Sequence, residues 1–182
     1  MPIMSVFSNR LTDPAQERGD YAAAILDLLG GRNPIAVLRD TPEAIGNAMN
    51  GMSLVQLRQP EATDKWSIAQ VLQHLADSDL VWGWRLRMIL AHDRPTITGY
   101  DQDLWADRLH YTESDPAESL ETFGVLRRAN LRLIERATPQ DLRRVGLHTE
   151  RGEESIAQLC GLYAGHDLSH LRQLDRIRAA VA

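Results

Sequence analysis

Two long segments of the chain carry histidines where a helix bundle normally carries leucines. In WSIAQVLQHLADSD, His74 lies beside an apolar face, and in GLYAGHDLSHLRQL, His166 and His170 are four residues apart. Apolar residues recur every three or four positions in both segments, which is the pattern of a helix that buries one face. Both segments therefore predict long helices that pack around polar side chains.

The rest of the chain also reads as helical, so we expect an all-α fold. Capping boxes, Ser67 with Gln70 and Ser155 with Gln158, start two of the helices. Thr41-Pro42 predicts an interruption of the second helix, because proline lacks an amide hydrogen. The predicted helices span about residues 14–29, 34–50, 67–92, 116–137 and 155–180.

Composition narrows the class of protein. The chain has 182 residues, which is enough for one domain with its own core. We therefore expect a single domain over residues 1–182. Within it, residues 1–31 would form an N-terminal extension helix and residues 32–182 the bundle. A net charge of −5 argues against nucleic-acid binding. Cys160 is the only cysteine, so a cysteine-rich zinc site is excluded. Without a signal-like or membrane-spanning apolar run, we expect a cytoplasmic protein that does not enter membranes. Homodimerisation is compatible with a bundle of this size.

The histidine spacing suits a metal site. Residues four apart share one helical face, so His166 and His170 can bind one ion, and His74 on a facing helix completes a His₃ set. Such a set leaves a coordination position open, as catalytic sites do. The alternative is that these are core or boundary histidines with ordinary hydrogen-bond partners, and the spacing leaves both interpretations open.

Acidic residues near the histidines each have more than one interpretation. Asp77 follows His74 by three residues and is an outer metal ligand, a catalytic base or a surface charge. Asp79 and Asp167 look buried, so each either orients a ligand histidine or pairs with an arginine. Glu150 is a second catalytic candidate, on a loop before the last helix that also carries His148, although a plain surface loop is the simpler expectation.

These motifs together resemble the DinB-like superfamily of metal-binding four-helix bundles. The resemblance rests on WSIAQVLQHLADSD, GYDQDLWADRLHY, HTERGEESIAQL and GHDLSHLRQL, and covers roughly Arg39 to Arg178. It implies an up-down-down-up bundle with a long crossover between core helices two and three, which residues 93–115 would form. It also implies that the three histidines bind a divalent metal, with zinc or nickel as in characterised relatives.

The resemblance suggests chemistry on a small-molecule substrate. Several relatives are thiol-dependent S-transferases, so our leading hypothesis is transfer of a low-molecular-weight thiol, as cosubstrate, to an electrophile. The second is metal-dependent hydrolysis by an activated water. The third is a non-enzymatic, stress-related small-molecule binding protein in which the metal stabilises the bundle. The candidate substrate-binding residues are Arg85, Arg172, Trp105 and His148.

Overall fold

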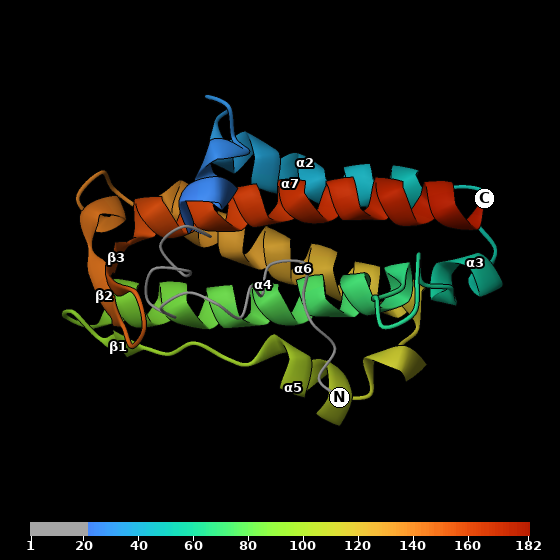
Figure 1. The fold of residues 1–182 in the computed structure, drawn as a ribbon. Coiled ribbons are helices and arrows are strands. Elements are labelled where there is room, and N and C mark those ends of the chain that lie inside the picture. Colours follow the sequence, from blue (N-terminus) through green and yellow to red (C-terminus); the bar gives the residue numbers. More distant parts are fainter. Residues whose placement is uncertain (1–21) are drawn as a thin grey trace.

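Four long helices run side by side through most of the molecule (Figure 1). The computed structural model describes residues 22–182. The long helices are α2 (Pro34–Met49), α4 (Ile68–Ala91), α6 (Pro116–Arg136) and α7 (Ile156–Val181). The shorter ones are α3 (Leu54–Arg58), α5 (Gln102–Arg108) and the 3₁₀ helices η1 (Tyr111–Glu113) and η2 (Asp141–Arg143).

The chain order of the bundle is up-down-down-up, which confirms the expectation from the sequence. Helices α2 and α7 run in one direction, and α4 and α6 run in the other (Figure 1). The main packing pairs are α2 with α7 and α4 with α6. Because α4 and α6 are parallel, the connection between them returns along the length of the bundle, and it contains α5 and η1.

Side-chain caps define where the two helices with histidines begin. The Ser67 amide donates to Gln70 Oε1 over 3.0 Å, and the Gln70 amide donates back to Ser67 Oγ over 3.4 Å. Ser155 and Gln158 form the same reciprocal pair at the start of α7. Both capping boxes satisfy amides that the first helical turn leaves without partners.

Helix α2 continues through Pro42, so the predicted interruption there is wrong. Proline lacks the amide hydrogen that would bond to the carbonyl of Leu38, four residues earlier. The Arg127 guanidinium donates to that carbonyl instead, over 2.8 Å. A side chain from α6 thus supplies the hydrogen bond that proline cannot make.

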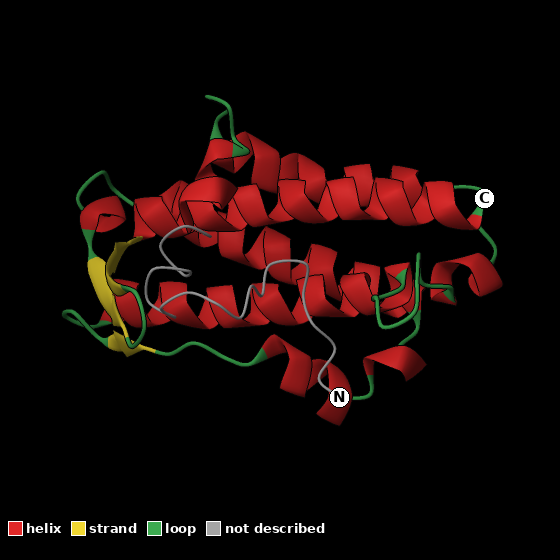
Figure 2. Cartoon of the chain, in the orientation of Figure 1, coloured by secondary structure: helices red, strands yellow, loops and turns green. Residues whose placement is uncertain are grey.

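A small three-stranded sheet covers one end of the bundle, where the sequence predicted only loops (Figure 2). Its strands are too short to show the alternation that predicts a strand from sequence. Ile97 pairs with His148 in the parallel half of the sheet, and Val145 pairs with Ser155 in the antiparallel half. The strands are β1 (Thr96–Ile97), β2 (Val145–His148) and β3 (Gly152–Ser155).

The segment before α2 packs on α7. Residues 22–27 are helical, and Gly30 and Gly31, both with positive φ, follow the predicted end of this helix. The predicted start near Pro14 lies outside the described residues. A Cβ added to Gly165 would lie 2.1 Å from the Ile25 carbonyl oxygen, so the two backbones touch. None of the described helices is long and apolar enough to cross a membrane.

A buried polar layer divides the core into two apolar clusters. One cluster contains Trp82, Leu86 and Ile89 of α4, and the other contains Val71, Leu72 and Leu75 earlier in that helix. The buried polar side chains of this layer include His74 and Asp79 on α4, Arg127 on α6 and Asp167 on α7. The candidate site is part of this layer.

Candidate metal centre

Two helices bring the three predicted histidines together. His74 lies on α4, two turns after its capping box, and His166 and His170 lie one turn apart on α7. Their ligand atoms all lie within 4.8 Å of one another. His74 is fully buried, whereas His166 and His170 are half-buried, so the partly exposed side of the cluster is the α7 side. The structure therefore contains the His₃ arrangement that the spacing predicted.

The separations of the ring nitrogens fit a shared ion. His166 Nε2 lies 3.1 Å from His74 Nε2 and 3.1 Å from His170 Nε2. Two nitrogens that each bind one metal at about 2.0–2.1 Å lie between about 2.8 Å (octahedral, 90°) and about 3.4 Å (tetrahedral) apart. Both observed separations fall in that range.

The protonation states also fit metal ligands. His170 Nδ1 lies 2.8 Å from Gln173 Oε1, and an amide oxygen only accepts, so Nδ1 carries the hydrogen and Nε2 keeps its lone pair. Burial lowers the pKa of all three imidazoles, and neighbouring histidines lower those of His74 and His166 further. Neutral imidazoles with convergent lone pairs are the form that binds a divalent cation.

Aromatic rings surround the centre. The Trp66 ring lies 5.1 Å from the His74 ring, and the Tyr163 ring lies 6.3 Å from that of His166. These bulky rings limit the movement of the imidazoles and exclude water from that side. The open side is the one where His166 and His170 are half-buried.

Asp79 and Asp167 both bind Arg127, which was the second of the two roles expected for them. Arg127 donates through Nη2 to Asp79 over 2.6 Å and through Nη1 to Asp167 over 2.5 Å, and all three side chains are 1% exposed. Among the described residues, no hydrogen bond joins either carboxylate to a histidine ring. Burial raises the pKa of Asp79 to about 6, although Arg127 opposes the shift.

Asp77 lies beside the centre and has specific partners. The Tyr111 hydroxyl donates to Asp77 Oδ2 over 2.5 Å, and Gln73 Nε2 donates to Oδ1 over 3.3 Å. The Tyr111 ring lies 6.3 Å from the Trp66 ring that also contacts His74. Asp77 is therefore a half-buried, oriented carboxylate next to a ligand and not a solvated surface charge.

His148 is buried in β2, so the expectation of a surface loop is wrong for this residue. The strand pairing holds its side chain under the sheet, which local sequence could not indicate. Glu150 is exposed on the turn that follows, and its carboxylate lies against Gly99. The turn brings Glu150 near His148, and Glu150 is not part of the histidine cluster.

The other predicted substrate-binding residues differ in position. Arg85 on α4 is buried and donates over 3.1 Å to the hydroxyl of Tyr163, which lies one helical turn before His166 on α7. Trp105 is half-buried on α5, with its ring 4.5 Å from the Tyr100 ring. Arg172 is exposed on α7.

Sequence reasoning missed Arg127, the residue that joins the polar layer. A signal for it existed, because Arg127 lies four residues after Phe123 and four before Leu131 on the buried face of α6. A charged residue at a core spacing predicts a buried ion pair. Its partners, however, are on two other helices.

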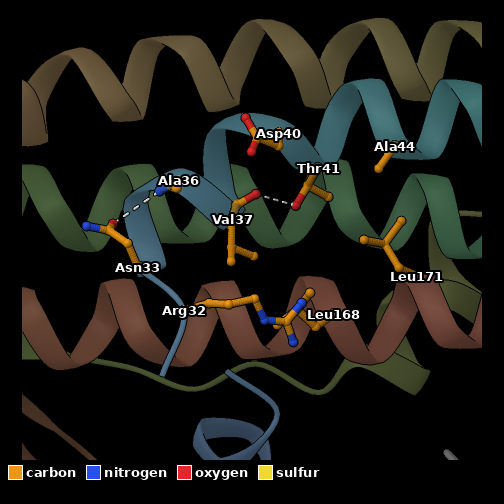
Figure 3. A pocket seen from close by; sticks show the side chains of 9 residues that line it. All are labelled: Arg32, Asn33, Ala36, Val37, Asp40, Thr41, Ala44, Leu168 and Leu171. Carbon is orange, nitrogen blue, oxygen red and sulfur yellow. Dashed lines mark hydrogen bonds between the residues drawn. The ribbon is translucent and has the colours of Figure 1, made fainter. Parts of the chain in front are cut away.

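A separate cavity of about 270 Å³ lies between α2 and α7 (Figure 3). Leu168 and Leu171 line it from α7, and no predicted site residue is among its lining residues. Arg32 and Asp40 bring charges to its rim from the α2 side. This cavity is therefore distinct from the histidine centre.

Comparison with known proteins connects this centre to a family. Residues 38–174, which include all three histidines, match the sequence profile of the DinB superfamily. The chain belongs to the DinB superfamily. The resemblance inferred from the motifs is thereby confirmed.

Other members of the DinB superfamily are similar over most of the chain. The "Putative metal-dependent hydrolase OB0782" of Oceanobacillus iheyensis is 30% identical over 141 residues, which are 77% of this chain and 81% of that protein. The "Putative metal-dependent hydrolase YfiT" of Bacillus subtilis is 29% identical, over 78% of this chain and 82% of YfiT.

A solved structure shares the fold. YfiT, described as "a probable metal-dependent hydrolase with an unusual four-helix bundle topology", superposes with a TM-score of 0.71 at 24% identity, over 93% of this chain and 92% of YfiT. This likeness confirms the four-helix bundle that we expected for a DinB-superfamily protein.

Proposed function

We propose that this chain is a metal-dependent hydrolase of a small-molecule substrate, with His74, His166 and His170 holding one divalent ion. The observation that carries the proposal is the convergence of three neutral imidazole nitrogens, 3.1 Å apart in two of the pairs. The names of the curated relatives support the same reaction class. Zinc and nickel are the expected ions, since imidazole ligands suit both.

A divalent ion on three neutral ligands would keep its full charge and would acidify a coordinated water. Asp77 is the residue placed to accept the released proton, because it follows His74 by one helical turn. Tyr111 and Gln73 each donate to one of its oxygens, which fixes the carboxylate plane and leaves further lone pairs free. Glu150 is a weaker candidate, because it lies on the exposed turn beside His148.

Transfer of a low-molecular-weight thiol is the second candidate. His166 and His170 are half-buried and not fully enclosed, so the open coordination position would be available to a thiol as well as to water. The chain has no reactive thiol of its own, because Cys160 is buried and burial raises its pKa to about 12. The thiol would therefore have to be a cosubstrate.

Elemental analysis of the purified protein tests the centre. We expect about one equivalent of zinc or nickel in the wild type and none in a His166→Ala, His170→Ala double variant. A matched His92→Ala, His110→Ala variant, which removes two exposed histidines, should keep the ion. Absence of metal from the wild type, even after loading, would refute the proposal.

Activity assays then separate the candidates. The metal-loaded protein is offered esters, lactones and amides, with and without glutathione or cysteine. Turnover without thiol supports hydrolysis, whereas consumption of thiol together with an electrophile supports transfer. A bound ion with neither activity, together with a large fall in melting temperature after chelation, would favour the non-enzymatic alternative.

A further inference from the structure

Arg85 is a buried cation without a counter-charge among the described residues. It is 5% exposed, and it donates to the Tyr163 hydroxyl over 3.1 Å and to the Thr98 carbonyl over 2.5 Å. Within residues 22–182, its Nε atom has no hydrogen-bond partner and no carboxylate forms an ion pair with it. Arg127, the other buried arginine, has two carboxylate partners.

This difference between the two arginines has an energetic consequence. A guanidinium stays protonated in proteins, so Arg85 cannot avoid the desolvation free energy of burial by becoming neutral. Buried charges are normally paired, since an unpaired one is strongly unfavourable. A neutral hydroxyl and a neutral carbonyl offset only part of this cost, so an anion from outside the chain would complete the site.

His148 presents a second unpartnered donor at the same place. It is 3% exposed and pairs in the sheet with Ile97, the residue before the Thr98 that binds Arg85. His148 Nδ1 accepts from the Glu150 amide over 3.2 Å, so the hydrogen is on Nε2. That atom is buried and has no partner in the part of the chain that the structure describes. Burial lowers the pKa of His148 to about 4, with nearby Arg151 and Arg85 contributing, so the ring is a neutral donor at neutral pH.

We propose that Arg85 and His148 form a binding site for the carboxylate of the substrate. Tyr163 links this site to the metal centre, because it accepts from Arg85 and lies one turn before His166 on α7. From the helical rise, Tyr163 lies about 5–10 Å along α7 from the two α7 histidines, so a carboxylate bound beside it would position a substrate whose other end reacts at the metal centre. That this carboxylate belongs to the substrate rests on the proposed hydrolase function.

One residue of the chain could take the place of the ligand. Glu150 is exposed on the turn after β2, and its carboxylate lies about where a side chain on Gly99 would be, 3.1 Å from an added Cβ. Glu154, which is also near His148, is already paired with Arg151. If Glu150 were the counter-charge of Arg85, neutralising it would destabilise the protein. If a ligand carboxylate is the counter-charge, Glu150→Gln should leave stability unchanged and strengthen carboxylate binding.

Calorimetric titration of the metal-loaded protein with hexanoate tests the site, with hexanamide as the neutral probe of equal size. We expect hexanoate to bind and hexanamide not to bind. Arg85→Gln should weaken hexanoate binding at least about tenfold, and His148→Gln should weaken it several-fold, because each removes a buried donor to an anion. Arg132→Gln, which changes an exposed arginine of α6, is the matched control and should bind as the wild type does.

Thermal unfolding without hexanoate separates a binding role from a structural one. Arg85→Gln should then be as stable as the wild type or more stable, since it removes an unpaired buried charge. The proposal is overturned if hexanoate does not bind, if it binds Arg85→Gln equally well, or if that variant unfolds several degrees lower. Equal binding would indicate direct ligation of the metal. Repeating the titration on metal-free protein separates the carboxylate-site proposal from the hydrolase proposal. Hexanoate should still bind the metal-free protein through Arg85 and His148, even if the protein has no metal-dependent activity.

Discussion

Replacing Arg127 by methionine should destabilise this protein more than any change at its surface. The side chain is 1% exposed and makes hydrogen bonds to Asp79, Asp167 and the Leu38 carbonyl, so it connects α6 with α4, α7 and α2. Methionine keeps most of the volume and removes every donor. The variant therefore isolates the polar contribution from the packing contribution.

The magnitude follows from what the variant leaves behind. Removing one partner of a buried ion pair costs about 3–5 kcal/mol, because the remaining charge has no compensation. The Leu38 carbonyl also loses its donor, and Pro42 cannot replace it, which adds about 1–3 kcal/mol. A loss of about 4–8 kcal/mol is comparable to the whole stability of a typical domain, about 5–15 kcal/mol.

Urea unfolding, followed by far-ultraviolet circular dichroism, measures this loss. A chelator is present for both proteins, so that metal affinity does not enter the comparison. The deficit of Arg127→Met should shrink at acid pH. Burial raises the pKa of Asp79, and the variant removes the Arg127 charge that opposes this shift. The folded variant therefore binds more protons than its unfolded state, and its stability falls as pH rises through the folded pKa of Asp79. Adding Asp79→Leu and Asp167→Leu should recover most of the loss.

Two results would contradict this reasoning. One is a loss below about 1 kcal/mol, the size expected for a solvent-exposed pair. The other is a deficit that stays the same in the triple variant, which would mean that the arginine acts through packing alone.

Three further predictions follow from other parts of the molecule. Chelation should lower the melting temperature of the wild type and should not change that of the His166→Ala, His170→Ala variant, as measured by calorimetry. Burial lowers the pKa of His148 to about 4 in the folded protein, whereas the unfolded value is about 6.5. Below about pH 6.5 the unfolded state therefore binds more protons than the folded state. The stability that His148 contributes is lost as pH falls from about 6.5 through 4. Unfolding titrations across that range should show a shallower loss for His148→Gln, and an equal slope would count against the buried neutral ring. Gly165→Ala should lower the free energy of unfolding in urea by more than about 2 kcal/mol, because the added Cβ would collide with backbone. The control is Gly46→Ala, where the nearest atom is 4.0 Å from the added Cβ. It should be neutral or stabilising by up to about 1 kcal/mol.

Local sequence was sufficient for the long helices and for the ligand spacing of the α7 histidines, but it left the metal and core-histidine interpretations open. Capping boxes and apolar spacing act within a few residues of one another, and His166 and His170 meet because four residues make about one turn. The position of His74 opposite them was inferred from the apolar face of its own helix. The family resemblance added the chain order, which spacing within single helices does not contain.

Tertiary packing decided the partners of the buried charges. Asp79 and Asp167 each had two interpretations from sequence. The structure shows that both pair with Arg127 of α6, which is 48 and 40 residues away from them in sequence. The same side chain allowed α2 to continue through Pro42. No pattern in a single segment can predict such contacts, because they depend on which helices become neighbours.

The short sheet shows the same limit at the other end of the bundle. Strands of two to four residues are defined by their pairing and not by their composition, so His148 could not be recognised as buried before β2 was placed between β1 and β3. The sequence by itself determined that this protein is a helical bundle with three histidines at ligand spacing, since helix geometry is local. Only the tertiary structure decided that Arg85 lacks a counter-charge among the described residues and lies near His148, because burial and pairing are properties of the assembled fold.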